Sequence, residues 1–314
     1  MFRKINSNKL TLVFLILLAF VVIIVLIDTK KGKSNFDRDL VSVDTADISK
    51  IIISSGKTGE EVILEKNGSW SVLNEGKKLD VDMRKVSTIL DMLAKMQSTG
   101  IITNQKEKWA EYDVTDTIAS RIQLFKKKKK TDDILIGRFN YTPSNNPYNR
   151  QGNFKTYVRL NDSKNVHVVK EFLAMVFTTG INDYRDGKIA KVNPADINKV
   201  IVSYPADSSF TLYKENNIWF ADGVIADSAK VMNYLNKFIN ISSKNFVDFN
   251  RETSPAYSLT IEANNTLQPV IIDVYPGKEG DDMVVHSSLN KEAYFSGNGS
   301  GLLKRLFIGK AGLL

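Results

Sequence analysis

The chain has 314 residues, of which 43% are hydrophobic and 25% are charged, so it describes a globular protein with room for two ordinary domains. It contains no cysteine and two histidines, which excludes a disulfide scaffold, a thiol nucleophile and a cysteine-rich or histidine-rich metal site. Arg3, Lys4 and Lys9 contribute three of the net +8 charges, and the remaining +5 (43 − 3 − 35) is mild for this length and does not argue for nucleic-acid binding.

The first feature in chain order is an apolar run from Leu10 to Ile27, in which Thr11 is the one polar residue. Its 18 residues just span a hydrocarbon core of about 30 Å. No small-residue cleavage site follows, so the run predicts an uncleaved transmembrane anchor rather than a signal peptide. We expect residues 1–9 to be a cytoplasmic tail and residues 28–40 a tether. Basic residues flank the run on both sides, so charge barely decides the orientation, and we place the body in the periplasm because that is usual for an N-terminal anchor.

Three strands and a helix are predicted next. Apolar runs rich in β-branched residues at 51–53 and 62–64 predict strands separated by a polar turn, and Asn67-Gly68 predicts a turn that places Trp70 on a third strand. A helix should then begin after Asp82, which is a good N-cap. Its apolar face is predicted from residues at helical spacing, namely Val86, Ile89, Leu90, Leu93 and Met96.

A meander of short strands is predicted after this helix. The strands are expected at 121–125, 134–137, 156–160 and 166–169, followed by an apolar helix at 172–177. The lysine run 126–130 joins the first two strands. It could bind phosphates or anionic lipid head groups, but a solvated hairpin tip is the better interpretation.

A long polar loop, residues 141–154, interrupts the meander. It is rich in amides, and we single out Tyr141, Asn146, Tyr148 and Arg150 as candidate ligand-binding or partner-binding residues. Long ordered loops inside compact domains are often functional, and stacking aromatics beside amides would suit a glycan, a peptide or a partner protein. An idle surface loop is the competing interpretation.

A charged cluster follows where the first half of the chain ends. Asp183, Arg185 and Asp186 could be a catalytic trio, but an ion-pair cluster that fixes a domain junction is the better interpretation. The two histidines, His167 and His286, lie in apolar strand-like patterns, and we interpret both as structural.

The second half of the chain repeats the first. Residues 47–54 return 149 positions later as residues 196–203, and the matching strand, tryptophan and helix positions follow in the same order. Further strands are expected in the second half at 257–261, 270–274, 283–286 and 293–295. A terminal helix is expected at 302–307. The repeat predicts an α+β fold of two tandem duplicated units, residues 41–186 and 187–314, each an antiparallel sheet packed with one or two helices.

Three segments of the chain resemble a bacterial family of domains of unknown function. They are residues 70–96, in which Val81-Asp82 leads into Lys85-Val86 and Leu90, residues 111–117 and the junction 183–188. Asp113 stands where the family usually has glycine and Thr117 where it usually has proline, so this turn is expected to close differently. The likeness covers most of residues 41–250. It implies a single-pass envelope protein, often encoded beside gliding-motility-type ABC transporter components.

Nothing in the sequence requires an enzyme, because neither a nucleophile elbow nor a His-Glu-x-x-His motif is present. We predict no catalytic residue, no metal and no cofactor. The resemblance implies a non-enzymatic accessory subunit that contacts an ABC transporter permease or auxiliary membrane subunit from the inner membrane, without nucleic acid. The alternative is a periplasmic module that holds a glycan or peptide through the 141–154 loop.

Overall fold

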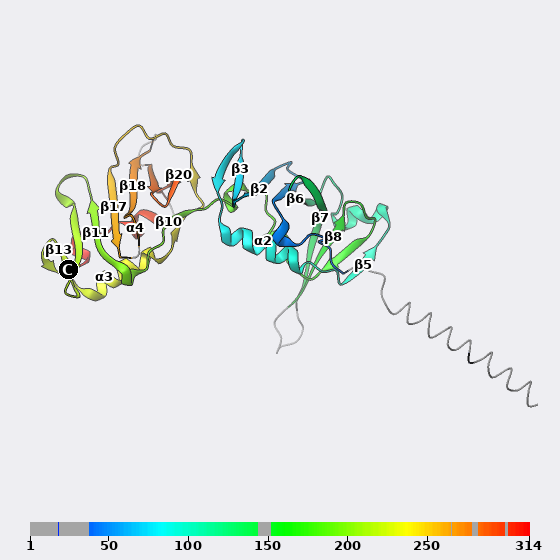
Figure 1. Cartoon of the computed structure of the whole chain (residues 1–314), viewed down its shortest axis with the longest axis horizontal. Coiled ribbons are helices and arrows are strands. Elements are labelled where there is room, and N and C mark those ends of the chain that lie inside the picture. Colours follow the sequence, from blue (N-terminus) through cyan, green and yellow to red (C-terminus); the bar gives the residue numbers. More distant parts are fainter. Residues whose placement is uncertain (1–17, 19–37, 144–151, 265, 278–281, 299–300) are drawn as a thin grey trace, which may run out of the picture.

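The computed structural model describes residues 18, 38–143, 152–264, 266–277, 282–298 and 301–314. Within these residues the chain forms two nine-stranded antiparallel sheets and one two-stranded sheet. The two large sheets lie side by side along the longest axis of the molecule (Figure 1). We call the first sheet with its helix the first unit, and the second sheet with its helix the second unit.

The first sheet has the strand order β4-β3-β2-β1-β6-β7-β8-β9-β5. Its strands are β1 (Lys50–Ser55), β2 (Glu61–Asn67), β3 (Ser69–Asn74), β4 (Lys77–Asp80), β5 (Gly100–Thr103), β6 (Ser120–Lys126), β7 (Lys129–Thr142), β8 (Asn153–Leu160) and β9 (Val166–Val169). The helices of this unit are α2 (Met83–Lys95) and the short 3-10 helices η1 (Thr45–Asp47), η2 (Lys106–Tyr112), η3 (Leu173–Met175) and η4 (Ile181–Asp183).

The second sheet has the same order, β14-β13-β12-β11-β17-β18-β19-β20-β16. Its strands are β11 (Ile197–Ser203), β12 (Phe210–Glu215), β13 (Ile218–Ala221), β14 (Val224–Ile225), β16 (Phe246–Val247), β17 (Tyr257–Ala263), β18 (Val270–Pro276), β19 (Met283–Ser287) and β20 (Asn290–Ser296). The helices are α3 (Ser228–Leu235), α4 (Leu302–Leu306), η5 (Pro194–Asp196), η6 (Ala206–Ser208), η7 (Asn236–Ile239) and η8 (Lys310–Gly312). The two-stranded sheet pairs β10 (Lys188–Ala190) with β15 (Ile241–Ser242).

Backbone hydrogen bonds outside the sheets also recur between the units. The amide of Asp82 donates to the carbonyl of Tyr184 at 2.7 Å, and the amide of Asp227 donates to the carbonyl of Leu313 at 2.9 Å. Both aspartates are helix N-caps, and both carbonyls belong to the last segment of their unit. Each unit therefore closes its C-terminal segment onto the start of its own helix.

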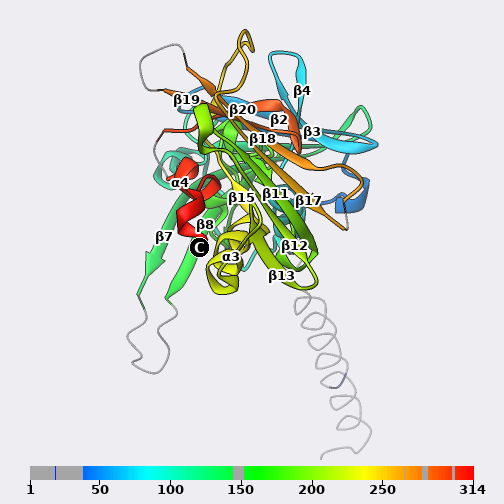
Figure 2. The same ribbon diagram turned by 90° about the vertical axis from the view of Figure 1, so that its left-hand side faces the viewer.

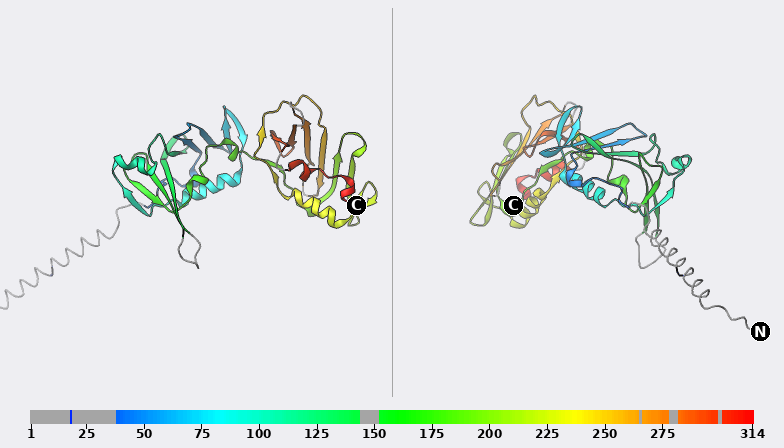
Figure 3. Two further views of the ribbon diagram at one scale, coloured as in Figure 1. Left: turned by 180° about the vertical axis from the view of Figure 1, so that it is seen from behind. Right: turned by 45° about the vertical axis from the view of Figure 1, so that its right-hand side comes forward.

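Each core lies between one face of a sheet and a helix. Alternate residues of β1 and β2 are fully buried, while their neighbours face the other side, as expected for strands with one covered face. Helix α2 begins at the predicted N-cap Asp82, whose Oδ1 accepts a hydrogen bond from the Arg84 amide, and it buries Val86, Ile89 and Leu93 against this sheet. Figure 3 shows α2 and α3 on the same side of the molecule, each under its own sheet.

The predicted fold class, a transmembrane helix followed by two α+β units, is wrong. The fold is mostly β, with 44% of residues in strands and 21% in helices, and its large sheets are antiparallel. The helix expected at 172–177 is only the 3-10 turn η3, and the terminal helix α4 has five residues. Strands outweigh helices because nine strands in each large sheet satisfy one another's backbone groups, while one or two short helices cover the core face of each sheet.

No helix in the described part of the chain is both long enough and apolar enough to cross a membrane. The anchor predicted at 10–27 lies outside the described residues, with the exception of Leu18.

Two turns of the first unit show how charged residues are accommodated. The lysine run forms the β6–β7 hairpin turn, where Lys126 pairs with Asp47 at 2.6 Å and Lys127 has a φ of 56°. Asp113, at the end of η2, has a φ of 57°. Glycine favours this left-handed conformation and aspartate tolerates it, so Asp113 can hold the turn that this chain forms.

Candidate binding site

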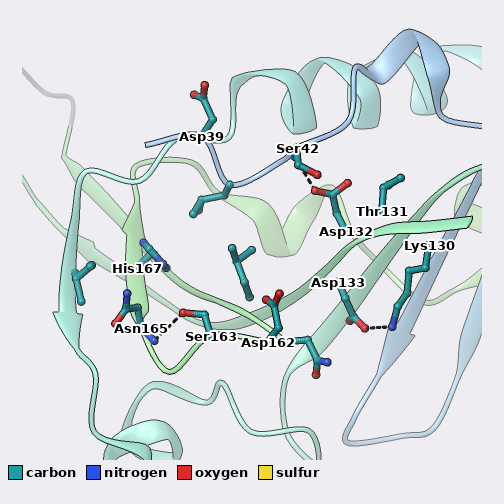
Figure 4. Close-up of a pocket in the computed structure, with 14 residues that line it drawn as sticks. Asp39, Ser42, Lys130, Thr131, Asp132, Asp133, Asp162, Ser163, Asn165 and His167 are labelled. Carbon is teal, nitrogen blue, oxygen red and sulfur yellow. Dashed lines mark hydrogen bonds and ion pairs between the residues drawn. The ribbon is translucent and has the colours of Figure 1, made fainter. Parts of the chain in front are cut away.

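A cavity of about 560 Å³ opens at one end of the first sheet. Its walls are the start of β7, the turn between β8 and β9, residue Ile101 of β5 and the segment 39–42 that precedes η1. Figure 4 shows Asp132, Asp162 and His167 arranged around it, each from a different segment. Four aspartates and one lysine line the cavity, so its charge is predominantly negative: Asp39, Asp132, Asp133, Asp162 and Lys130.

Asp132 is the most unusual of these residues because its side chain is buried. The residue is 8% exposed, and its Oδ1 accepts a hydrogen bond from the Ser42 amide at 2.6 Å. Its Oδ2 is also buried but accepts no hydrogen bond from any described residue. A buried polar atom without a partner costs about 1–3 kcal/mol, and more when it carries charge. A carboxylate in this state at a cavity wall is a candidate for contact with a bound group.

Asp133 points to the opposite face of β7, as successive strand residues do. Its oxygens accept hydrogen bonds from Arg121 Nε at 2.7 Å, Lys130 Nζ at 2.6 Å and Gln123 Nε2 at 3.2 Å. Burial on its own raises the pKa of Asp133, but these hydrogen bonds outweigh burial and lower the pKa to about 2. Asp133 is therefore an ionised, fully partnered carboxylate that supports the wall.

The opposite wall carries a buried histidine. His167 is 5% exposed, and its Nδ1 lies 3.0 Å from Ser98 Oγ. Burial lowers the pKa of His167, so its imidazole is neutral near pH 7 and does not offset the aspartates. The turn beside it is closed by Ser163, whose Oγ accepts a hydrogen bond from the Asn165 amide at 3.1 Å. This turn leaves Asp162 exposed at the cavity mouth.

The register of the sheets identifies the equivalent place in the second unit. Asp132 pairs with Leu124, and Val270 of β18 pairs in the same way with Ile261, so a buried valine stands where the first unit has Asp132. On the edge strands, Ile101 pairs with His167 and Phe246 pairs with Phe295. Phe246 is therefore the counterpart of the cavity residue Ile101.

The chain itself fills this equivalent place in the second unit. The guanidinium carbon of Arg185 lies 3.8 Å from the centre of the Phe246 ring. Asn290 Nδ2 donates to the carbonyl of Asp186 at 2.5 Å, and Ser287 Oγ donates to the carbonyl of Ile189 at 2.6 Å. Burial lowers the pKa of Arg185, and the nearby charge of Asp248 opposes this effect. The first unit has the equivalent segment at 38–42, because the Arg38 carbonyl accepts from the Ser98 amide at 2.7 Å as the Gly187 carbonyl accepts from the Ser243 amide at 2.9 Å. The positions equivalent to Arg185 and Asp186 are 36 and 37, which lie outside the described residues.

The three predicted junction residues lie together between the units, but not as the ion-pair cluster that we expected. Arg185 donates to Asn182 Oδ1 at 3.3 Å, and no salt bridge among the described residues joins it to Asp183 or Asp186. Asp186 instead accepts hydrogen bonds from Lys188, from its amide at 2.9 Å and from its Nζ at 3.1 Å. Lys244 of the second unit donates to the carbonyls of Asp183 and Arg185 at 3.3 and 2.6 Å. Backbone carbonyls, the Phe246 ring and an ion pair between Lys244 and Asp82 at 3.7 Å therefore connect the units.

Of the predicted loop residues, Tyr141 alone lies within the described part of the chain; Asn146, Tyr148 and Arg150 lie outside it. The Tyr141 ring lies 5.1 Å from the ring of Phe154, and these side chains are 46% and 39% exposed. They belong to β7 and β8, which extend as a hairpin beyond the rest of the sheet (Figure 2). Neither Tyr141 nor Phe154 lines the acidic cavity.

Two buried charged residues were not singled out from the sequence. Asp132 could have been found, because alternation places it on the same strand face as the core residues Ile134 and Ile136, and the repeat has valine there. Arg159 could not, because its partners are distant in sequence. Its guanidinium carbon lies 3.8 Å from the Trp109 ring centre, and its Nε donates to the carbonyl of Val114 at 3.1 Å.

The fold and the cavity define a class: a tandem antiparallel β-sheet protein with an acidic cavity at the end of its first unit. The chain belongs to the family described as Domain of unknown function (DUF4340), which matches residues 70–260. This match runs from β3 to β17 and includes the junction. No curated protein and no solved structure matches the chain. Among the described residues, no cluster of histidine, aspartate and glutamate has an arrangement that could hold a metal ion.

Proposed function

We propose that this protein is a non-enzymatic accessory subunit of an ABC-type transport system in the bacterial envelope, and that it acts through protein–protein contacts. The body lies in the periplasm and is held at the inner membrane through residues 10–27. Its partner is the transporter permease or an auxiliary membrane subunit.

One observation carries this proposal: an acidic cavity opens in the first unit beside the edge of its sheet. The cavity opens beside the edge strand β5, which pairs with β9 alone among the described strands. Unpaired strand edges and grooves at the end of a sheet are common places for an extended peptide to bind. The apolar run at 10–27 supports a membrane location.

The test is affinity purification of the tagged full chain from native membranes in mild detergent, with identification of the recovered proteins by mass spectrometry. We expect a transporter permease or auxiliary subunit to be enriched over a purification with an unrelated tagged membrane protein. Recovery of the chain without any transporter component would contradict the proposal.

The same purification tests the alternative, a periplasmic module that holds a glycan or peptide through the 141–154 loop. The exposed pair Tyr141 and Phe154 at the base of this loop favours it, because such rings can stack on a sugar. A glycan or peptide that copurifies with the chain and is lost in Tyr141→Ala would support this second function.

A further inference from the structure

We propose that one face of the β7–β8 hairpin binds the lipid surface of the membrane that holds the predicted anchor. This inference rests on the membrane location in the proposed function and adds a second membrane contact that orients the first unit. The part of the hairpin that projects beyond the sheet, which we call the hairpin extension, comprises the described residues 138–143 and 152–155 (Figure 2).

Four aromatic rings form a continuous row on one face of the hairpin extension and at its base. Tyr141 pairs directly with Phe154, and Phe139 lies two residues earlier on the same strand, so strand alternation puts all three on one face. The ring centres of Phe139 and Phe172 lie 4.0 Å apart. The Phe154 ring centre lies 5.8 Å from that of Phe139 and 5.1 Å from that of Tyr141. The row therefore runs outward from the core and ends in two exposed rings.

Packing fixes the outermost ring in this row. The Tyr141 ring lies directly against Gly152, where an added Cβ would clash with it. The ring is therefore held on the face that it shares with Phe154, although both side chains are exposed. An ordered pair of exposed rings presents an apolar surface without a further loss of side-chain entropy on binding.

The opposite face of the hairpin is polar and basic. The guanidinium carbon of Arg138 lies there, 5.7 Å from the centre of the Tyr112 ring, and Lys155 pairs with Asn140. Between positions 138 and 155 the sequence has three basic residues and neither aspartate nor glutamate. Aromatic rings on one face with cations on the other are typical of a segment at the boundary of water and lipid, because the rings enter the acyl boundary while the cations attract anionic head groups.

The described chain begins on the hairpin side of the first sheet. The Arg38 carbonyl accepts a hydrogen bond from the amide of Ser98, and the amide of the next residue bonds to Val168 of β9. Val168 pairs with Tyr157 of β8, close to the base of the hairpin extension. Four residues after Arg38, the Ser42 amide bonds to the start of β7, which is the far end of that strand. The chain that precedes Arg38 therefore enters the first unit from the hairpin side.

The length of the tether brings the hairpin within reach of the membrane. Residues 28–37 separate the predicted anchor from Arg38, and ten extended residues span at most about 35 Å. The path from Arg38 to the exposed rings crosses about three strand spacings and about three residues of β8, which is at most about 25 Å. The rings can therefore reach the lipid surface from which the anchor emerges.

A glycan is the competing occupant of this face. A sugar site needs placed hydrogen-bonding groups beside its stacking rings. The hydroxyl of Tyr141 is the one polar side-chain group of the four rings, and the amides of Asn140 and Asn153 lie on the opposite face by strand alternation. A lipid interface makes no such demand, because a tyrosine hydroxyl stays at the level of the head groups while its ring packs below them. The chemistry of the face thus favours lipid.

The experiment uses the full chain reconstituted into vesicles of phosphatidylethanolamine and phosphatidylglycerol. Because the chain has no cysteine, Thr142→Cys places a single thiol beside Tyr141 for a nitroxide label. The matched position is Leu267→Cys, at a fully exposed apolar residue between β17 and β18 of the second unit. Saturation of the electron paramagnetic resonance signal compares collisions of the label with oxygen, which dissolves in lipid, and with a water-soluble nickel chelate.

We expect the label at 142 to be shielded from the nickel chelate and to collide with oxygen, while the label at 267 stays open to the chelate. Lipid is the sole ligand present, so a hairpin that binds a glycan or a protein instead would leave the label at 142 in water. Equal exposure of the two labels to the chelate therefore overturns the inference. This measurement keeps all four rings and does not depend on how their substitution affects folding.

Variants locate the contact. Tyr141→Ala combined with Phe154→Ala should lower the ratio of docked to free hairpin about tenfold, because less than half of each ring remains to be buried. Lys155→Gln should lower it about fivefold in vesicles with phosphatidylglycerol. Lys128→Gln is the matched control, because this exposed lysine lies beyond the other end of β7, about 40 Å away, and should change nothing. A larger effect of Lys128→Gln than of Lys155→Gln would assign the lipid contact to the lysine run and refute the hairpin.

The outcomes separate this inference from the proposed function. A chain that floats with the vesicles while its label at 142 stays in water would refute the hairpin contact and leave the accessory role standing. A shielded label at 142, together with purification that recovers no transporter subunit, would refute the accessory role alone.

Discussion

Substitution of Gly187 by alanine should destabilise the second unit at its first residue. A Cβ at this position would lie 2.0 Å from the carbonyl oxygen of Ser243 and 3.0 Å from its carbonyl carbon. Both atoms are backbone, so no flexible side chain can move away. The Ser243 amide also donates to the Gly187 carbonyl at 2.9 Å, and separating the two segments would strain this bond as well. Overpacking costs about 1–3 kcal/mol and a lost hydrogen bond about 1 kcal/mol, so we expect a loss of about 2–4 kcal/mol.

The assay is urea unfolding of the full chain, followed by the fluorescence of Trp219 after Trp70 and Trp109 have been replaced by phenylalanine. Trp219 is buried in the core of the second unit and therefore reports that unit alone. With a urea dependence of about 2 kcal/mol per molar, the midpoint should fall by about 1–2 M. Gly309→Ala is the control, because a Cβ there would have no atom within 4 Å and its φ of −69° suits alanine. If the two variants shift the midpoint equally, the close packing described for Gly187 is wrong.

Three further predictions concern stability and location. Leu93→Ala, at a fully buried position of α2, should cost about 2–5 kcal/mol in urea unfolding of the first unit, and the half-buried neighbour Leu90→Ala should cost clearly less. The folded pKa of Asp133 is about 2, below its ordinary value of 3.8, so its ionised form stabilises the fold by about 2 kcal/mol above pH 4, and this stabilisation is lost as the pH falls toward 2. Asp133→Asn should lack this part of the acid dependence of unfolding. An unchanged pH profile in the variant would contradict the assignment. Protease added to spheroplasts should digest the body of the chain, whereas full protection would place the body on the cytoplasmic side.

Much of the local structure could be predicted from the sequence. Short apolar runs rich in β-branched residues predicted β1 and β2, a further strand was expected at 121–125 within β6, and the N-cap Asp82 with its apolar stripe predicted α2. The overall class was wrong because short apolar runs do not distinguish a helix from a turn packed on a core. Residues 172–177 illustrate this: Leu173 and Phe177 are buried as a helix would require, but the chain between them makes only a 3-10 turn.

The site was less predictable because its parts come from distant segments. Ser42 and Asp132 meet across 90 positions, and Ser98 and His167 across 69. The sequence drew attention to Arg185 through its neighbouring charges, yet its main contact is the ring of Phe246, whose position follows from the pairing of edge strands. A comparison of the two units by strand register, rather than by residue type alone, would have shown that a buried valine, Val270, takes the place of Asp132 in the second unit.

The most direct test of the account is site-specific photo-crosslinking in cells that express the full chain. A photoreactive residue replaces Ile101 at the cavity wall in one strain and Ile225 on the edge strand β14 of the second unit in another; both positions are exposed, at 44% and 67%. The account predicts a crosslinked product with a transporter permease or auxiliary subunit from position 101 but not from position 225, and loss of that product when Asp132→Asn is added. A product formed equally from both positions, or none from position 101, would contradict the claim that the cavity of the first unit is the partner-binding site.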